Sequence, residues 1–139
     1  MAPIVIHGVQ PHEAREWWGL VDEWLQKALD EDFLGSHGLD DIHQAVESQH
    51  MQLWAVFAPN LKAALVTQIA NYPKASSLVV ILCGGSDLQD WALGATDVLQ
   101  RFAKHHGCSS VACNGRKGWV RALKNHGWRE IATTVAIEA

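Results

Sequence analysis

Apolar side chains recur every three to four residues in several parts of the chain, which is the spacing of one buried helix face. The two longest patterns cover residues 11–35 and 88–103. Shorter patterns of the same kind lie at 39–48 and 118–127. The spacing therefore predicts four helices, the first and third being the longest.

The segments between these helices have the patterns of strands. Residues 51–73 hold two strand-like runs joined by a turn, and 76–83 ("SSLVVILC") is a continuous apolar run, typical of a central strand covered on both faces. A short strand is predicted at 107–113, and alternating apolar and polar positions predict a closing strand at 128–139. The alternation of strands and helices predicts a single mixed α/β domain over residues 1–139.

Composition agrees with a globular domain of this kind. The chain has 139 residues, 48% of them apolar and 19% charged, and no apolar run approaches the ~20 residues of a membrane span. The N-terminus has no signal-peptide pattern, so we expect a cytoplasmic protein. The three cysteines are odd in number and lie in or beside apolar segments, which favours buried thiols over a disulfide framework or a zinc site.

Charge is unevenly distributed along the sequence. Residues 1–50 carry ten acidic and two basic side chains, whereas 100–139 carry two acidic and seven basic ones. One end of the molecule could therefore attract a cationic amine and the other an anionic ligand, although solvated helix surfaces would give the same pattern. The sequence pI of about 6.0 and the acidic N-terminal third make nucleic acid an unlikely partner.

The stretch "ILCGGSDLQDW", residues 81–91, joins a predicted strand to a predicted helix through two glycines. The first backbone N–H groups of a helix are unsatisfied and its dipole favours anions, so such a turn can hold a phosphate. Ser86 with Gln89 three residues later also forms a capping box, which would explain the turn without any ligand. Asp87 would repel a phosphate unless it points away.

The order of elements, together with the stretches "QLWAVF", "ALVTQIANYP", "LVVILCGG", "HHGC", "GRKGWVRAL" and "HGW", resembles the GNAT (Gcn5-related N-acetyltransferase) superfamily. The combination is similar to small GNAT-like proteins of tailed bacteriophages and prophages over residues 39–130. The resemblance implies a mixed central sheet flanked by helices, in which the strands at 76–83 and 107–113 are parallel and splay apart.

It also implies a site for acetyl-CoA as cosubstrate. Its pyrophosphate would lie on the backbone of the glycine turn: Cys83, Gly84, Gly85, Ser86, Asp87 and Leu88. The family motif has a cation that this turn lacks, and Arg116 or Lys117 in the loop before the last helix is the nearest replacement by topology. The family often has a tyrosine on the last helix as the acid that protonates the leaving thiolate, and Leu123 occupies that position here.

In GNAT-like proteins the connection after the first long helix borders the acceptor. Glu31, Asp32 and His37 are therefore the candidates for accepting a proton from an amine. Sequence alone does not choose among them, and an acidic helix end would explain the two carboxylates.

The spacing of His43, Glu47 and His50 would place their side chains on one helix face, as two His and a carboxylate do in catalytic zinc sites. No fourth anchored ligand is evident, and a solvated face explains the same spacing. We expect no metal site.

The sequence thus predicts an acyl-CoA-dependent N-acyltransferase, or an acyl-CoA binder derived from one, encoded by a phage or prophage. The acceptor would be an amine of a small molecule or a protein. The alternative is a non-catalytic GNAT-fold structural or assembly protein, whose partners would be phage virion proteins. The protein would lie in the cytoplasm of a bacterial host, or in the virion.

Overall fold

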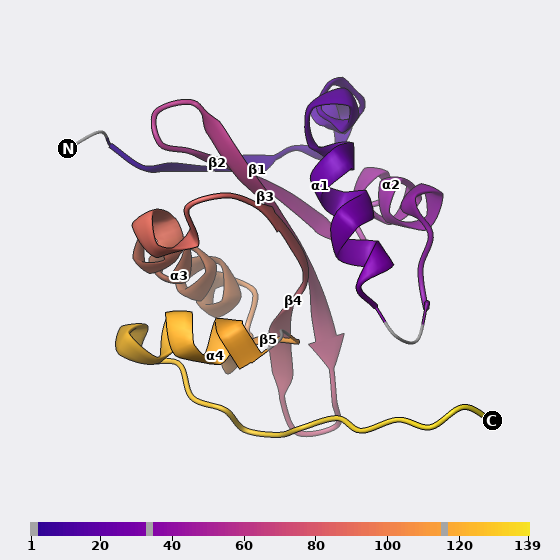
Figure 1. Cartoon of the computed structure of the whole chain (residues 1–139), viewed down its shortest axis with the longest axis vertical. Coiled ribbons are helices and arrows are strands. Elements are labelled where there is room, and N and C mark those ends of the chain that lie inside the picture. Colours follow the sequence, from indigo (N-terminus) through magenta and orange to yellow (C-terminus); the bar gives the residue numbers. More distant parts are fainter. Residues whose placement is uncertain (1–2, 33–34, 115–116) are drawn as a thin grey trace.

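The computed structural model describes residues 3–32, 35–114 and 117–139 (Figure 1). A five-stranded sheet with the order β1-β2-β3-β4-β5 runs through the middle of the molecule. Its strands are β1 (Val5–Val9), β2 (Gln52–Phe57), β3 (Leu61–Asn71), β4 (Ser76–Gly85) and β5 (Ser110–Cys113). Neighbouring strands are antiparallel except β4 and β5, which are parallel.

Helices cover both faces of this sheet. The helical elements are η1 (Pro11–Glu16), α1 (Trp18–Asp30), α2 (Leu39–Glu47), α3 (Leu88–His105), α4 (Lys117–Leu123) and η2 (Lys124–His126). Figure 1 shows α1 and α2 on one side of the sheet and α3 and α4 on the other. The fold is therefore a mixed α/β sheet flanked by helices, as the family resemblance implied.

The alternation along β2 explains how one sheet supports two cores. Leu53 lies in the core under α1 and α2, whereas Trp54, the next residue, lies in the core under α3. Because successive strand residues point to opposite faces, a strand covered on both sides is apolar at every position. That is why the middle of β2 and of β3 is buried throughout.

Two terminal segments differ from the sequence prediction. The strand β1 was not predicted, because only five residues pair with β2 and they precede a proline. The closing strand predicted at 128–139 is wrong for this chain: these residues form no helix or strand. Its alternating pattern is real, but none of the strands in the described part of the chain pairs with it.

The remaining helix boundaries shift slightly. The first predicted helix divides at Trp17, where the 3-10 turn η1 ends and α1 begins, and α1 ends at Asp30. None of the helices in the described part of the chain is long and apolar enough to cross a bilayer.

Candidate active site

The parallel strands β4 and β5 pair over only part of their length. β4 pairs with β5 from Ser77 to Val80, but with β3 along its whole length up to Gly85. The five residues from Ile81 to Gly85 therefore have a strand on one side only. β5 ends at Cys113, opposite Val80, so the described part of the chain leaves a gap beside these residues of β4. It lies at the carboxyl ends of two parallel strands, where α/β proteins commonly bind ligands.

A β-bulge marks the point where the gap begins. Val80 pairs with Thr67 and Leu82 pairs with Val66, so Ile81 has no partner on β3. The side-chain alternation changes there too: Val80 faces the α3 core, but Leu82 faces the α1 core. A bulge bends a strand and leaves one residue outside the ladder. The bulge at Ile81 therefore lies where the pairing of β4 with β5 ends.

The turn after β4 differs from the cradle predicted from sequence. The N-cap of α3 is Asp87, with φ 61° and ψ 38°, and no side chain caps the helix. The predicted Ser86 cap is therefore wrong. The amide of Ser86 donates to the Lys62 carbonyl at 3.0 Å, and Gly85 lies opposite Ala63 in the β3–β4 ladder. The Ser86 amide therefore serves the sheet, and the prediction that it turns outward is wrong. The Gly85 N–H belongs to the neighbouring, non-hydrogen-bonded pair of the ladder and faces away from β3.

Both glycines of the turn are required by protein contacts. A Cβ at Gly84 would lie 2.7 Å from the carbonyl oxygen of Trp24, in the middle of α1. At Gly85, where φ is +126°, a Cβ would lie 2.3 Å from the Lys62 carbonyl oxygen. Because these neighbours are backbone atoms, the two glycines let α1 and β3 approach β4 closely.

The unsatisfied amides lie one step further along, at the start of α3. The N–H groups of Asp87, Leu88 and Gln89 have no acceptor among the described residues, as expected for the first turn of a helix. Lys62 Nζ lies 3.8 Å from Asp87 Oδ2. The start of α3 thus combines amide donors that have no acceptor with two charged groups: the Lys62 ammonium from β3 and the Asp87 carboxylate.

Sequence reasoning missed Lys62 as a site residue. It lies 25 positions before Asp87 on the polar side of a predicted strand, and nothing local in the sequence connects the two. Only the β3–β4 pairing brings them together. The cations predicted instead were Arg116 and Lys117. Arg116 lies outside the described residues, and Lys117 is the first residue of α4.

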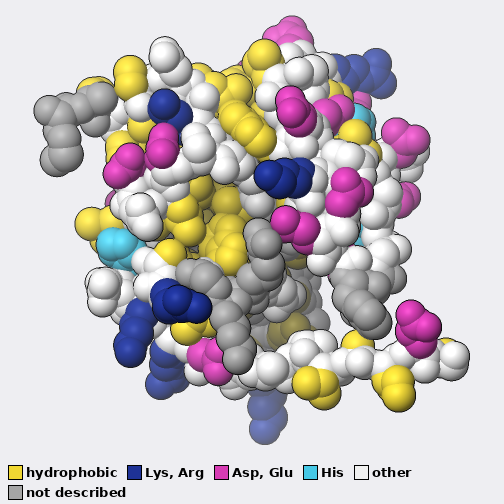
Figure 2. All heavy atoms as spheres, viewed as in Figure 1, with side chains coloured by type: hydrophobic (Ala, Val, Ile, Leu, Met, Phe, Trp, Pro, Cys, Tyr) yellow, Lys and Arg dark blue, Asp and Glu magenta, His cyan; other side chains and the backbone are white. Residues whose placement is uncertain are grey.

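Apolar side chains from α3, α4 and the two parallel strands form the wall beyond the gap. They leave a half-open cavity of only about 20 Å³, lined by Leu65, Val80, Leu88, Trp91, Ala92, Ala95, Thr96, Leu99, Cys113, Trp119, Leu123 and Trp128. That space is about the size of one water molecule. Figure 2 shows further apolar side chains gathered in a hollow between α3 and α1 on the face in view.

Two cysteines lie at this gap, Cys83 beyond the bulge on β4 and Cys113 at the end of β5. Burial raises the pKa of the Cys83 thiol well above its usual range, and the nearby Cys113 adds to the shift. Burial also raises the pKa of Cys113, to about 11. Since the thiolate is the nucleophilic form, neither group is suited to form a covalent acyl intermediate near neutral pH.

This protonation state can be measured by thiol labelling. In a Cys108→Ser variant at pH 7, we expect Cys83 and Cys113 to react with a disulfide reagent more than about a hundredfold slower than in the urea-unfolded chain, because both burial and the raised pKa values suppress the thiolate. The native rate should rise as the pH approaches 11. Rapid native labelling of both thiols at pH 7 would contradict the burial described here.

The three acceptor-side candidates lie at the α1–α2 connection. Asp32 Oδ2 accepts hydrogen bonds from the backbone N–H and the hydroxyl of Ser36, at 3.2 and 3.0 Å, and Ser36 Oγ lies 2.9 Å from His37 Nδ1. Ser36 thus brings Asp32 and His37 into one exposed network. Glu31 caps α1 and is also exposed.

Helix geometry places this connection near the level of the bulge. α1 runs opposite to β4 in Figure 1, and Trp24 lies against Gly84. From Gly84 back to Val80 is about 13 Å of strand, which corresponds to about nine residues of helix. Nine residues after Trp24, the chain has passed the end of α1 at Asp30 and entered the α1–α2 connection.

The residues considered for a metal have other partners. His43 Nε2 lies 2.8 Å from Asp22 Oδ1 and its ring stacks on Trp18, while Glu47 accepts a hydrogen bond from Arg15. In the described part of the chain, no three His, Cys, Asp or Glu side chains are placed to hold a metal ion.

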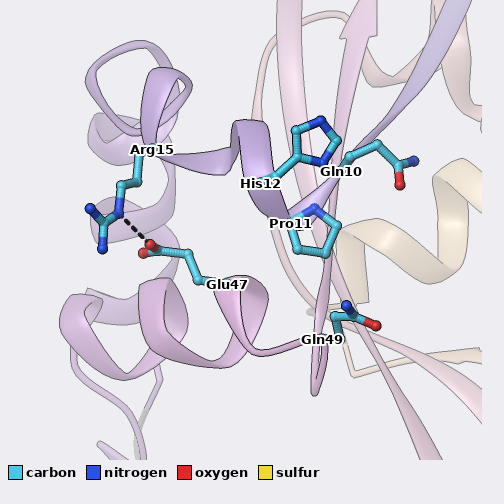
Figure 3. Close-up of a pocket in the computed structure, with 6 residues that line it drawn as sticks. All are labelled: Gln10, Pro11, His12, Arg15, Glu47 and Gln49. Atoms are coloured by element: carbon cyan, nitrogen blue, oxygen red, sulfur yellow. Dashed lines mark hydrogen bonds and ion pairs between the residues drawn. The ribbon is translucent and has the colours of Figure 1, made fainter.

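A second, more open hollow of about 710 Å³ lies between η1 and the end of α2 (Figure 3). It is lined by Gln10, Pro11, His12, Arg15, Glu47 and Gln49. Arg15 donates to Glu47 at 2.7 Å, and that hydrogen bond holds the pKa of the Glu47 carboxyl below its usual range. Because this ion pair neutralises the hollow, we favour the gap between β4 and β5 as the functional site.

Solved structures share the fold of this chain, whereas no protein-family model and no curated protein matches its sequence. An aminoglycoside acetyltransferase from an uncultured soil metagenomic sample matches with a TM-score of 0.71 at 12% identity, over 99% of both chains. The ribosomal-protein-alanine N-acetyltransferase of Brucella melitensis biovar Abortus 2308 matches with a TM-score of 0.66 at 14% identity, also over 99% of both chains.

A third similar structure is the aminoglycoside 6'-N-acetyltransferase AAC(6')-Ih of Acinetobacter baumannii. It has a TM-score of 0.67 at 14% identity and covers 99% of this chain and 98% of its own. Identities this low establish the fold and leave the substrate open. With a mixed five-stranded sheet whose parallel strands pair over only four residues, and helices on both faces, the chain has the fold of the GNAT acetyltransferases.

Proposed function

We propose that the protein is an acyl-CoA-dependent N-acyltransferase of the GNAT type, with acetyl-CoA as its cosubstrate. The observation that carries this proposal is the end of the β4–β5 pairing at Val80, with the bulge at Ile81 where the gap begins. The gap provides a row of β4 backbone groups with no neighbouring strand. It ends at the free amides of α3, which suit an anion.

Different groups of the chain would bind different parts of acetyl-CoA. Amides of Asp87, Leu88 and Gln89, together with the Lys62 ammonium, would hold a pyrophosphate by charge-assisted hydrogen bonds. Backbone N–H groups of β4 beyond the bulge would hold an amide-bearing arm and, at the thioester, the developing oxyanion. Bound acetyl-CoA would supply an activated acyl group for direct attack by an amine, and the protonated Cys83 and Cys113 would take no covalent part.

The acceptor amine would approach from the α1–α2 side. Asp32 and His37, linked through Ser36, and Glu31 nearby are placed to attract a cationic amine and to accept its proton directly or through water. Two proteins of similar structure are an aminoglycoside acetyltransferase and a ribosomal-protein-alanine N-acetyltransferase. Small polyamines and protein amino groups therefore both belong among the acceptors to be tested.

The tight apolar wall has a consequence for binding. Because only about 20 Å³ is free there, an acyl-pantetheine arm can enter only if Trp119, Leu123 or Trp128 moves away from α3. Three tryptophans line this space, so their fluorescence should change when CoA binds.

The test of turnover is the release of CoA from acetyl-CoA, followed by thiol detection with each acceptor in turn: a polyamine, an aminoglycoside and a peptide with a free amino terminus. We expect one acceptor to accelerate release above the rate without acceptor. A blank without acetyl-CoA corrects for the protein's own thiols, and mass spectrometry should find the acylated amine.

A second candidate function is acyl-CoA binding without turnover. It is favoured by Leu123, a buried side chain with no proton to give, at the position where the family often has a tyrosine. In that case CoA would bind but none of the acceptors would accelerate its release. Such a protein would act as a binding or assembly component, for which phage virion proteins are the proposed partners.

A further inference from the structure

Thr96 is one of two polar residues that are buried in the described part of the chain, the other being Thr67. Thr96 Oγ1 donates to the Ala92 carbonyl at 2.8 Å within α3, and it accepts a hydrogen bond from Trp128 Nε1 at 2.9 Å. Trp128 lies two residues after η2, so this second hydrogen bond crosses from the end of the helical region to the middle of α3. The Trp128 N–H keeps this partner only while the two segments stay together.

This hydrogen bond is the sole polar connection of its kind. Among the described residues, no other hydrogen bond or ion pair joins 119–139 to 3–114. Figure 1 shows α4 lying alongside α3, with the last residues leading away from it. Since α4 has only seven residues, it would not stay helical in water once detached from α3.

The contact between α4 and α3 is also incompletely packed. The half-open cavity of about 20 Å³ lies between them, with Thr96 and Trp128 both in its lining. Val80 and Cys113, the last pair between β4 and β5, line the same cavity. The space under α4 therefore adjoins the candidate site.

We propose that α4 and η2 form a lid over the candidate site, and that the Trp128–Thr96 hydrogen bond is its latch. The closed arrangement leaves room for about one water molecule, so acyl-CoA would enter when the latch is released. Gly127, with φ +90°, ends η2 and turns the chain so that Trp128 returns to α3. The role in acyl-CoA entry rests on the proposed function, whereas the latch itself does not.

The latch has a kinetic consequence. If acyl-CoA binds only the open form, the apparent affinity is reduced by the fraction of molecules that are open. Thr96→Val removes the acceptor of the Trp128 N–H in the closed form, whereas water can satisfy that N–H in the open form. The open fraction and the rate of CoA association should both rise about threefold to tenfold, the scale of one lost hydrogen bond. The dissociation rate should not change, because the latch is already broken in the complex.

The association rate is measured by stopped-flow tryptophan fluorescence with CoA. Trp128→Phe removes the donor, keeps an aromatic ring and leaves Thr96 bonded to Ala92, so it should behave like Thr96→Val. Thr96→Ser is the matched control. It keeps the hydroxyl and should associate with CoA at the rate of the unchanged protein.

Hydrogen exchange without CoA tests the latch by itself. Amides of Arg121–Leu123 in α4 should exchange about threefold to tenfold faster in Thr96→Val and in Trp128→Phe, again the scale of one lost hydrogen bond. Thr96→Ser should leave them unchanged. Amides of Val5–Val9, in β1, should be unaffected in every variant.

Two results would overturn the latch. One is unchanged exchange of α4 in both Thr96→Val and Trp128→Phe. The other is slower association of CoA with both variants, which a purely structural role of the hydrogen bond predicts. If the unchanged protein does not bind CoA, the proposed function and the role of the lid in entry are both refuted, whereas the exchange measurement still decides the latch.

Discussion

Replacing Gly85 with alanine should destabilise the fold by about 2–4 kcal/mol, the combined scale of overpacking and of a strained backbone. With φ at +126°, the new Cβ would lie 2.3 Å from the Lys62 carbonyl oxygen and 2.4 Å from Ala63 Cα. Both atoms belong to the backbone of β3, so relief requires the two central strands to separate. Urea unfolding followed by circular dichroism measures the change.

Gly107→Ala is the matched control. Gly107 also has a positive φ, +76°, but nothing lies within 4 Å of an added Cβ. Only the left-handed conformation is penalised, at about 1–2 kcal/mol. If Gly85→Ala costs no more than Gly107→Ala, contact with β3 is not the reason for the glycine, and a role in ligand approach becomes the better explanation.

Removing the Lys62 side chain should weaken CoA binding about tenfold, the scale of one charge-assisted hydrogen bond. The reason is its position beside the free amides at the start of α3, where it supplies the cation that the turn itself lacks. Titration calorimetry of Lys62→Ala measures the loss. Lys104→Ala, at the opposite end of α3, removes an equal charge and should leave the affinity unchanged.

Asp87→Asn should have the opposite effect on CoA binding. It removes a negative charge close to the proposed pyrophosphate and releases Lys62 from its ion pair. Asparagine also tolerates the left-handed conformation at this N-cap, so the helix start should survive. Weaker CoA binding by this variant would show that the electrostatic account of the turn is wrong.

The order of elements was predictable because each depends on a local pattern. The run "SSLVVILC" is covered on both faces, as a continuous apolar run indicates, and the strand it forms is parallel to the one that ends at Cys113. The tail at 129–139 was predicted as a strand from an equally good pattern. A strand also needs a partner edge, and no pattern within one sequence supplies that.

The candidate site was less predictable, because it depends on pairings between distant segments. The sequence identified the turn around Gly84 and Gly85, but which amides are free is decided by the β3 carbonyl that accepts from Ser86. The same pairing brings Lys62 to Asp87. The bulge at Ile81, where the gap begins, appears only in the register between β3 and β4.

The central claim is that acyl-CoA binds in the gap between β4 and β5. Backbone amide chemical shifts of the ¹⁵N-labelled chain, followed while CoA is added, test it most directly. We predict that the shifts concentrate at Ile81–Cys83, at Asp87–Gln89 and at the end of β5. No shifts at millimolar CoA, or shifts confined to the hollow around Arg15 and Glu47, would contradict the claim.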